Sequence, residues 1–104
     1  MSTRYYSQTM DRLTRTVTCV DHVGPDTVLL FTEFDMHDRL LNQVRFEHLK
    51  GMLANALFTR FGPNGRVEEQ WVFLYDENGR VTDQFGFDEQ GRPLDWERRL
   101  PAAC

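Results

Sequence analysis

The sequence has few of the residues from which catalytic sites are built. Serine occurs only as Ser2 and Ser7, and cysteine only as Cys19 and Cys104. Cys19 alternates with apolar residues, which predicts a buried, reduced thiol; a disulfide between the two cysteines is the less favoured interpretation. Neighbouring acidic residues point to opposite faces of a strand, so they do not converge for acid–base catalysis. We therefore expect no catalytic residue and no enzymatic activity.

Ligands for metals and cofactors are scarce as well. The histidines are His22, His37 and His48. In a chain of strands joined by short turns, His37 would lie about 30 Å from the other two, roughly the length of one strand. The sequence also contains no glycine-rich phosphate loop and no metal-ligand spacing. We expect neither a metal nor a cofactor.

Long apolar runs are absent too. The longest, such as residues 28–31, are far shorter than a membrane-spanning helix requires. Residues 1–6 contain no apolar signal core, so we expect a cytoplasmic protein. The formal net charge of −4 disfavours binding to nucleic acid or to anionic membranes.

What the sequence does contain is an internal repeat centred on arginine. An aromatic residue stands five positions before each of Arg39, Arg66, Arg80 and Arg92. Asn-Gly or Gln-Gly precedes the arginine in three of these four segments, and such pairs tolerate the positive φ of tight hairpin turns. The repeat predicts one strand and one turn every 12–15 residues. Acidic residues near the turn arginines predict exposed ion pairs there.

This repeat predicts an all-β fold in a single domain, residues 1–104: an antiparallel up-and-down meander of about seven strands, forming a curled sheet or a small barrel. We expect strands at 12–20, 27–35, 39–47, 52–60, 66–75, 80–87 and 93–99, with residues 4–7 as a candidate eighth. Residues 47–60 also have the spacing of an amphipathic helix, but the register of the repeat favours a strand there.

Alternation along these strands sorts the side chains onto two faces. One predicted face is apolar and forms the core: Val17, Cys19, Val28, Leu30, Phe34, Leu40, Val44, Phe46, Met52, Ala54, Ala56, Phe58, Val67, Trp71, Phe73, Tyr75, Val81, Phe85, Phe87 and Trp96. The other predicted face is mixed, with the amides Gln43, Asn55, Gln70 and Gln84 at mid-strand. So many aromatic rings should nearly fill the interior, so we expect no large ligand cavity.

The C-terminal part of the repeat resembles the YD repeats of bacterial RHS proteins. Tyr75-Asp76 followed by Gly79-Arg80 matches that motif best, and the segment 87–92 matches with Phe in place of Tyr. The segment 61–66 lacks the aspartate. In that family, tandem hairpins build a long β-shell, for which this chain is too short. The resemblance implies β-hairpin architecture and not the function of the family.

The function that we favour from the sequence is that of a small non-enzymatic binding protein of bacterial or phage origin. It would cover the surface of a partner protein, as immunity proteins and phage inhibitors do. We expect the contact residues on the mixed face: Leu41, Gln43, Arg45, Leu57, Gln70, Val72 and Gln84. An acidic chain suits a basic partner, because complementary charge speeds association. Two alternatives are a calycin-like β-barrel with a small ligand between Trp71, Phe85 and Trp96, and a self-associating structural β domain such as a homodimer.

Overall fold

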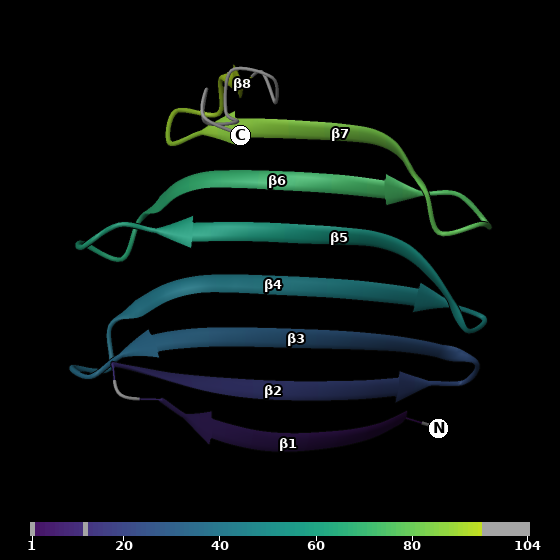
Figure 1. The fold of residues 1–104 in the computed structure, drawn as a ribbon, viewed down its shortest axis with the longest axis horizontal. Helices are drawn as coiled ribbons and strands as arrows, with labels where there is room; N and C mark the ends of the chain where they lie inside the picture. The colour runs from purple at the N-terminus through teal and green to yellow at the C-terminus, as the bar shows by residue number, and fades with distance from the viewer. Residues whose placement is uncertain (1, 12, 95–104) are drawn as a thin grey trace.

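The computed structural model describes residues 2–11 and 13–94, which form one antiparallel sheet (Figure 1). The strands are β1 (Ser2–Met10), β2 (Thr14–Val23), β3 (Asp26–Asp35), β4 (Leu40–Leu49), β5 (Met52–Phe61), β6 (Val67–Tyr75), β7 (Val81–Asp88) and β8 (Pro93–Leu94). They follow one another across the sheet in chain order, with β1 and β8 at opposite edges. The predicted all-β up-and-down meander is confirmed, with eight strands rather than seven. It is an open sheet and not a barrel, and no helix occurs among the described residues.

Four turns with the same backbone hydrogen bonds explain the arginine repeat. In the turn between β6 and β7, the backbone N–H of Asp76 donates to the carbonyl of Arg80 (2.9 Å), and that of Gly79 donates to the carbonyl of Asp76 (3.1 Å). Gly79 has a φ of 80°, which a residue without a Cβ adopts at no steric cost. The same pair of backbone bonds closes the turns at 35–39, 62–66 and 88–92. The turn therefore requires a glycine, or a residue tolerant of positive φ, just before the arginine.

The connection from β4 to β5 settles the structure of residues 47–60. Lys50 and Gly51 both have positive φ, 53° and 81°, as the two central residues of a type I′ hairpin turn do. Leu49 pairs with Met52, and the ladder continues to Asn42 opposite Arg60. The strand predicted at 52–60 is confirmed, and the helical interpretation is wrong.

The pairing register defines two faces, because directly paired residues point to the same side of a sheet. We call one the Trp71 face. It carries two rows of paired residues: Phe31, Val44, Phe58, Trp71 and Gly86, and beside them Leu29, Phe46, Ala56, Phe73 and Gln84. We call the other the Gln70 face. Its two central rows are Leu30, Arg45, Leu57, Val72 and Phe85, and Thr32, Gln43, Thr59, Gln70 and Phe87.

These faces correct part of the predicted core. The sorting is confirmed in the middle of β4, β5 and β6, where the predicted core residues Val44, Phe46, Ala56, Phe58, Trp71 and Phe73 share the Trp71 face. It is wrong for further residues that lie on the Gln70 face instead, among them Val17, Cys19, Val28, Leu30, Phe34, Phe85 and Phe87. The register shifts by one residue near four of the turns, and each such bulge breaks a parity carried over from the preceding strand.

Packing on the Trp71 face centres on β5 and β6. The rings of Phe46, Phe58 and Phe73 meet edge to face, with centroids 6.4 Å and 5.4 Å apart, the arrangement that aromatic quadrupoles favour. Ala56 (0% exposed) and Trp71 (7%) are the buried apolar residues among those described. A sheet normally buries one face against a second layer, but the described residues form a single layer. Both faces therefore leave apolar side chains accessible.

Candidate functional site

The predicted contact residues fall mostly on the Gln70 face. Arg45, Leu57 and Val72 are directly paired across β4, β5 and β6, so they form one continuous row. Gln43 and Gln70 occupy the next row, on either side of Thr59. These five predicted residues therefore make one contiguous surface over three strands.

Hydrogen bonds fix the two glutamines. The Gln43 Nε2 group donates to Thr32 Oγ1 at 3.2 Å, and the Gln70 Nε2 group donates to Thr59 Oγ1 at 3.3 Å. Both bonds run between neighbouring strands, so the amides lie flat along the sheet. Each amide keeps a second N–H donor and its carbonyl acceptor beyond this bond, and Gln43 also lines the pocket described below.

Two predicted contact residues lie elsewhere. Gln84 pairs with Phe73 and belongs to the Trp71 face, so it is not part of this surface. Leu41 stands at the register shift where Glu33 pairs with Asn42 and Phe34 pairs with Leu40, and it has no cross-strand partner. The parity error in β7 explains the first misplacement, and a bulge that strict alternation ignores explains the second.

Sequence reasoning missed two aromatic residues on this face. Phe85 pairs with Val72 and extends the row of Arg45 and Leu57 to the next strand, while Phe87 pairs with Gln70. Their exposed fractions are 48% and 37%. A signal was present in the sequence: Gly86, between them, has no side chain to bury, and it faces the opposite side.

The charge on the Gln70 face is locally balanced. The Arg45 guanidinium is bonded to the Glu47 carboxylate at 2.9 Å, and the two side chains are 40% and 25% exposed. Such an exposed pair contributes little to stability. Arg45 can still exchange this contact for a carboxylate on another protein, because its planar group has several donors.

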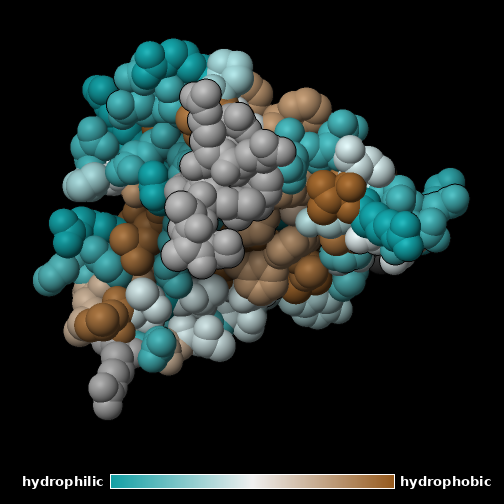
Figure 2. Space-filling view, turned by 45° about the horizontal axis from the view of Figure 1, so that its top comes forward, coloured by the Kyte–Doolittle hydropathy of each residue, from teal (hydrophilic) through white to brown (hydrophobic). Residues whose placement is uncertain are grey.

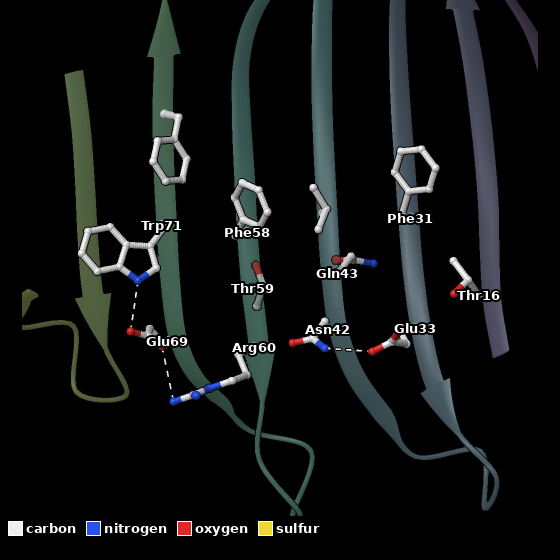
Figure 3. A pocket seen from close by; sticks show the side chains of 12 residues that line it. Thr16, Phe31, Glu33, Asn42, Gln43, Phe58, Thr59, Arg60, Glu69 and Trp71 are labelled. Carbon is white, nitrogen blue, oxygen red and sulfur yellow. Dashed lines mark hydrogen bonds and ion pairs between the residues drawn. The ribbon is translucent and has the colours of Figure 1, made fainter. Parts of the chain in front are cut away.

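The Trp71 face contains a pocket of about 600 Å³, contrary to the expectation that no large cavity exists (Figure 3). Its apolar lining includes Phe31, Val44, Phe58, Trp71 and Phe73. Pockets of this size accept drug-sized ligands. The sheet therefore offers a hollow on the face opposite the predicted contact surface.

The ligand site of the alternative barrel interpretation, between Trp71, Phe85 and Trp96, does not form either. Phe85 cannot line a cavity with Trp71, since the two side chains point to opposite faces. Trp96 lies outside the described residues. Instead, the pocket extends from Trp71 across β5 and β4 to Phe31, as the side chains in Figure 3 show.

A polar row borders the pocket toward the turn between β5 and β6. Thr16, Glu33, Asn42, Arg60 and Glu69 are paired in sequence across β2 to β6, and all line the pocket. Glu69 is 7% exposed. Its carboxylate accepts a hydrogen bond from Trp71 Nε1 at 3.0 Å and forms an ion pair with Arg60 at 3.3 Å (Figure 3). The buried carboxylate is thus compensated by charge and by hydrogen bonding.

The turn edge next to this row holds aspartates with altered acidity. The backbone N–H of Arg39 lowers the pKa of Asp35 most, and that of Arg92 does the same for Asp88. Each aspartate also binds the side chain of its arginine, at 2.9 Å and 2.8 Å. The predicted exposed ion pairs are therefore present at these two turns.

The histidines do not assemble a metal site. His22 pairs with Thr27, which pairs in turn with His48, so an intervening strand separates the two rings. Nδ1 of His22 lies 3.0 Å from Thr27 Oγ1. Among the described residues, no group of three or more potential metal-binding side chains occurs. No helix in this part of the chain could span a membrane.

Known proteins give no further guide to the site. Comparison of the chain with protein-family models, with curated proteins and with solved structures finds no match. The resemblance to YD repeats therefore remains a prediction, and function has to be argued from the two faces.

Proposed function

We propose that the protein is a non-enzymatic binding protein that covers a partner protein's surface with its Gln70 face, in the manner of immunity proteins and phage inhibitors. The observation that carries this proposal is the exposed ring of Phe85, which continues the row formed by Arg45, Leu57 and Val72.

The composition of this row supports a protein contact. Protein interfaces combine an apolar centre with aromatic residues and arginine, which dominate the binding energy. Here the apolar centre is Leu57 and Val72, with Arg45 on one side and Phe85 on the other. Apolar side chains lie among hydrophilic ones on the side of the molecule that Figure 2 shows.

The surrounding polar groups support a flat protein partner. Gln43 and Gln70 border the row and offer amide groups, as interface rims commonly do. The net charge of −4 favours a basic partner by speeding the encounter.

The test is capture of the partner from the native host by the immobilised protein and by three variants. We expect Leu57→Asp and Phe85→Asp to lose the partner, because the first places a charge in the apolar centre of the interface and the second replaces the aromatic ring beside it with a charge. We expect Arg45→Glu to weaken capture by reversing the charge beside them. Circular dichroism of each variant verifies that the sheet is retained.

Gln84→Arg is the matched control, since it changes an exposed residue on the opposite face of the same strand as Phe85. It should capture the partner as the unaltered protein does. The proposal is wrong if folded Leu57→Asp, Phe85→Asp and Arg45→Glu variants retain every partner.

Self-association is a second candidate, favoured by the outer edge of β1. This strand, Ser2–Met10, has no proline, and its one charged residue, Arg4, is paired with Asp21 at 2.6 Å. Hydrogen bonding to Asp21 raises the pKa of Arg4. No described strand pairs with the other side of β1, and such edges accept a further strand. Sedimentation at several concentrations distinguishes a dimer from a monomer, and a monomer throughout excludes this candidate.

A further inference from the structure

We propose that the pocket on the Trp71 face binds an organic cation: an ammonium group on an apolar, aromatic-sized body, with its charge beside Glu33. This proposal does not rest on the partner contact at the Gln70 face, because Phe31, Phe58, Trp71 and Glu33 point to the opposite side of the sheet from Arg45, Leu57, Val72 and Phe85.

The apolar body has a preformed surface to occupy. Phe31, Val44, Phe58 and Trp71 are paired in one row across four strands, and all line the pocket of about 600 Å³. Phe58, in the middle, is 39% exposed, although a phenyl ring gains by burial. A flat apolar group placed over Phe58 would remove that exposed area from water.

The charges in the pocket decide the sign of the ligand. Arg60 is the cation of the lining, and its guanidinium is already shared between Glu68 at 3.5 Å and Glu69 at 3.3 Å. An anionic ligand would therefore compete with two carboxylates for one guanidinium. Two strands away from Arg60 along the same row lies a carboxylate with no such compensation.

That carboxylate belongs to Glu33. Its hydrogen-bond partner is the neutral amide of Asn42, at 3.0 Å, and no described cationic side chain forms an ion pair with it. Glu33 follows Phe31 by two residues on one strand, so it lies about 7 Å along the same face. An ammonium group at Glu33 would thus remain near the aromatic rings, whose faces also attract cations.

The experiment compares three probes that share one aromatic body: 4-phenylbutylammonium, 4-phenylbutanol and 4-phenylbutanoate. Titration calorimetry gives the affinities, and the NMR signal of the Trp71 indole N–H reports binding in the pocket. We expect the ammonium to bind about tenfold more tightly than the alcohol, the size of one ion pair combined with a cation–π contact. The carboxylate should bind most weakly.

Variants of the polar row assign the preference to Glu33. Glu33→Gln should bring the ammonium and the alcohol to equal affinity. Asn42→Asp adds a second carboxylate beside Glu33 and should enlarge the preference for the ammonium. The two variants should therefore change this preference in opposite directions. Phe58→Ala should weaken all three probes together. Glu47→Gln, which removes a carboxylate from the Gln70 face, is the matched control and should change nothing.

Three results would overturn the proposal. The first is that no probe binds at concentrations up to about 10 mM, because a small fragment that fits such a pocket should have a dissociation constant below that concentration. The second is that the carboxylate binds as well as the ammonium. The third is that the ammonium preference survives in the folded Glu33→Gln protein. Loss of partner capture by Phe85→Asp has no bearing on any of these results, so the two proposals fail separately.

Discussion

Trp71 and Phe85 stand on neighbouring strands and are both large aromatic residues, yet Trp71 is 7% exposed and Phe85 is 48% exposed. Trp71 points to the Trp71 face, where Gly86 on the paired strand leaves room for the indole ring to lie over the backbone. Phe85 points to the Gln70 face. It lies on β7, the last long strand of the sheet, and its paired neighbour on β6 is the smaller Val72. The difference comes from what stands across the strand pair and not from the hydrophobicity of either residue.

This comparison shows how one sheet can carry two separate surfaces. On the Trp71 face, rings pack on one another and line an open pocket. On the Gln70 face, side chains lie in flat rows that end in exposed phenylalanines. This difference in shape is the basis for proposing a small molecule on one face and a protein partner on the other.

Removing each aromatic side chain should give the largest contrast. We expect Trp71→Ala to lower the free energy of unfolding by about 3–5 kcal/mol, as for other buried tryptophans. Phe85→Ala should cost about 1 kcal/mol or less, because its ring is half exposed. Urea denaturation of both variants measures the difference. Equal losses would show that the two faces are packed alike.

Filling the space under Trp71 should have the next largest effect. A Cβ on Gly86 would lie 2.5 Å from ring atoms of Trp71, which cannot move aside without leaving the sheet. We expect Gly86→Ala to cost about 1–3 kcal/mol, the usual penalty for overpacking. Gly62→Ala is the control: its Cβ would meet the flexible end of Glu68, also at 2.5 Å, and should cost less. The interpretation fails if Gly62→Ala is the more damaging change.

The success and failure of the sequence-based predictions follow from the same geometry. The turn at 76–80 was predictable because positive φ before Arg80 demands glycine, and that rule holds without tertiary contacts. Which residues of β3 point to which face was not predictable. Residues 28–31 are apolar without interruption, so either assignment of alternate residues to the two faces places apolar groups on both. In β7, Phe85 and Phe87 alternate with smaller or polar residues, which suggests burial of the rings. Their neighbours across the sheet, and not this pattern, place them on the Gln70 face.

The candidate site was predictable to the same degree. Arg45, Leu57 and Val72 lie near the middle of three consecutive predicted strands, where the predicted alternation of faces holds, so their grouping was predicted. The pocket was not predicted, because a hollow depends on the curvature of the sheet and on ring orientations. No local pattern of residues specifies those.

A smaller contrast separates Gln70 from Gln84. Gln70 is half-buried and bonds to Thr59, which is 7% exposed, so Gln70→Ala leaves the Thr59 hydroxyl without this partner. We expect a loss of about 0.5–1.5 kcal/mol, the usual net value of one hydrogen bond. Gln84→Ala, on the exposed side of the Trp71 face, should stay within about 0.5 kcal/mol of the unaltered protein. Thermal unfolding of the pair measures this difference, and a larger effect at Gln84 would refute the assigned faces.

The aspartates of the turns should make a small contribution to the stability of the whole sheet, without distinguishing its two faces. Because folding lowers the pKa of Asp35 and Asp88 below 3.8, their contribution is present above that pH and is lost as the pH falls through the folded values. Unfolding measured at about pH 7 and about pH 3 should show this loss, and Asp35→Asn with Asp88→Asn should reduce it. Glu77→Gln, which removes a carboxylate from the turn between β6 and β7 and leaves Asp35 and Asp88 in place, is the control. An undiminished acid loss in the double variant would contradict this assignment.

The most direct test of the two-face account is a nuclear Overhauser spectrum of the unaltered protein. The account predicts contacts between the Trp71 ring and the α-protons of Gly86, together with contacts from the Phe85 ring to the methyl groups of Val72 and Leu57. Contacts from the Phe85 ring to Trp71 or Phe73 would contradict it, because they would place Phe85 in the aromatic cluster on the Trp71 face.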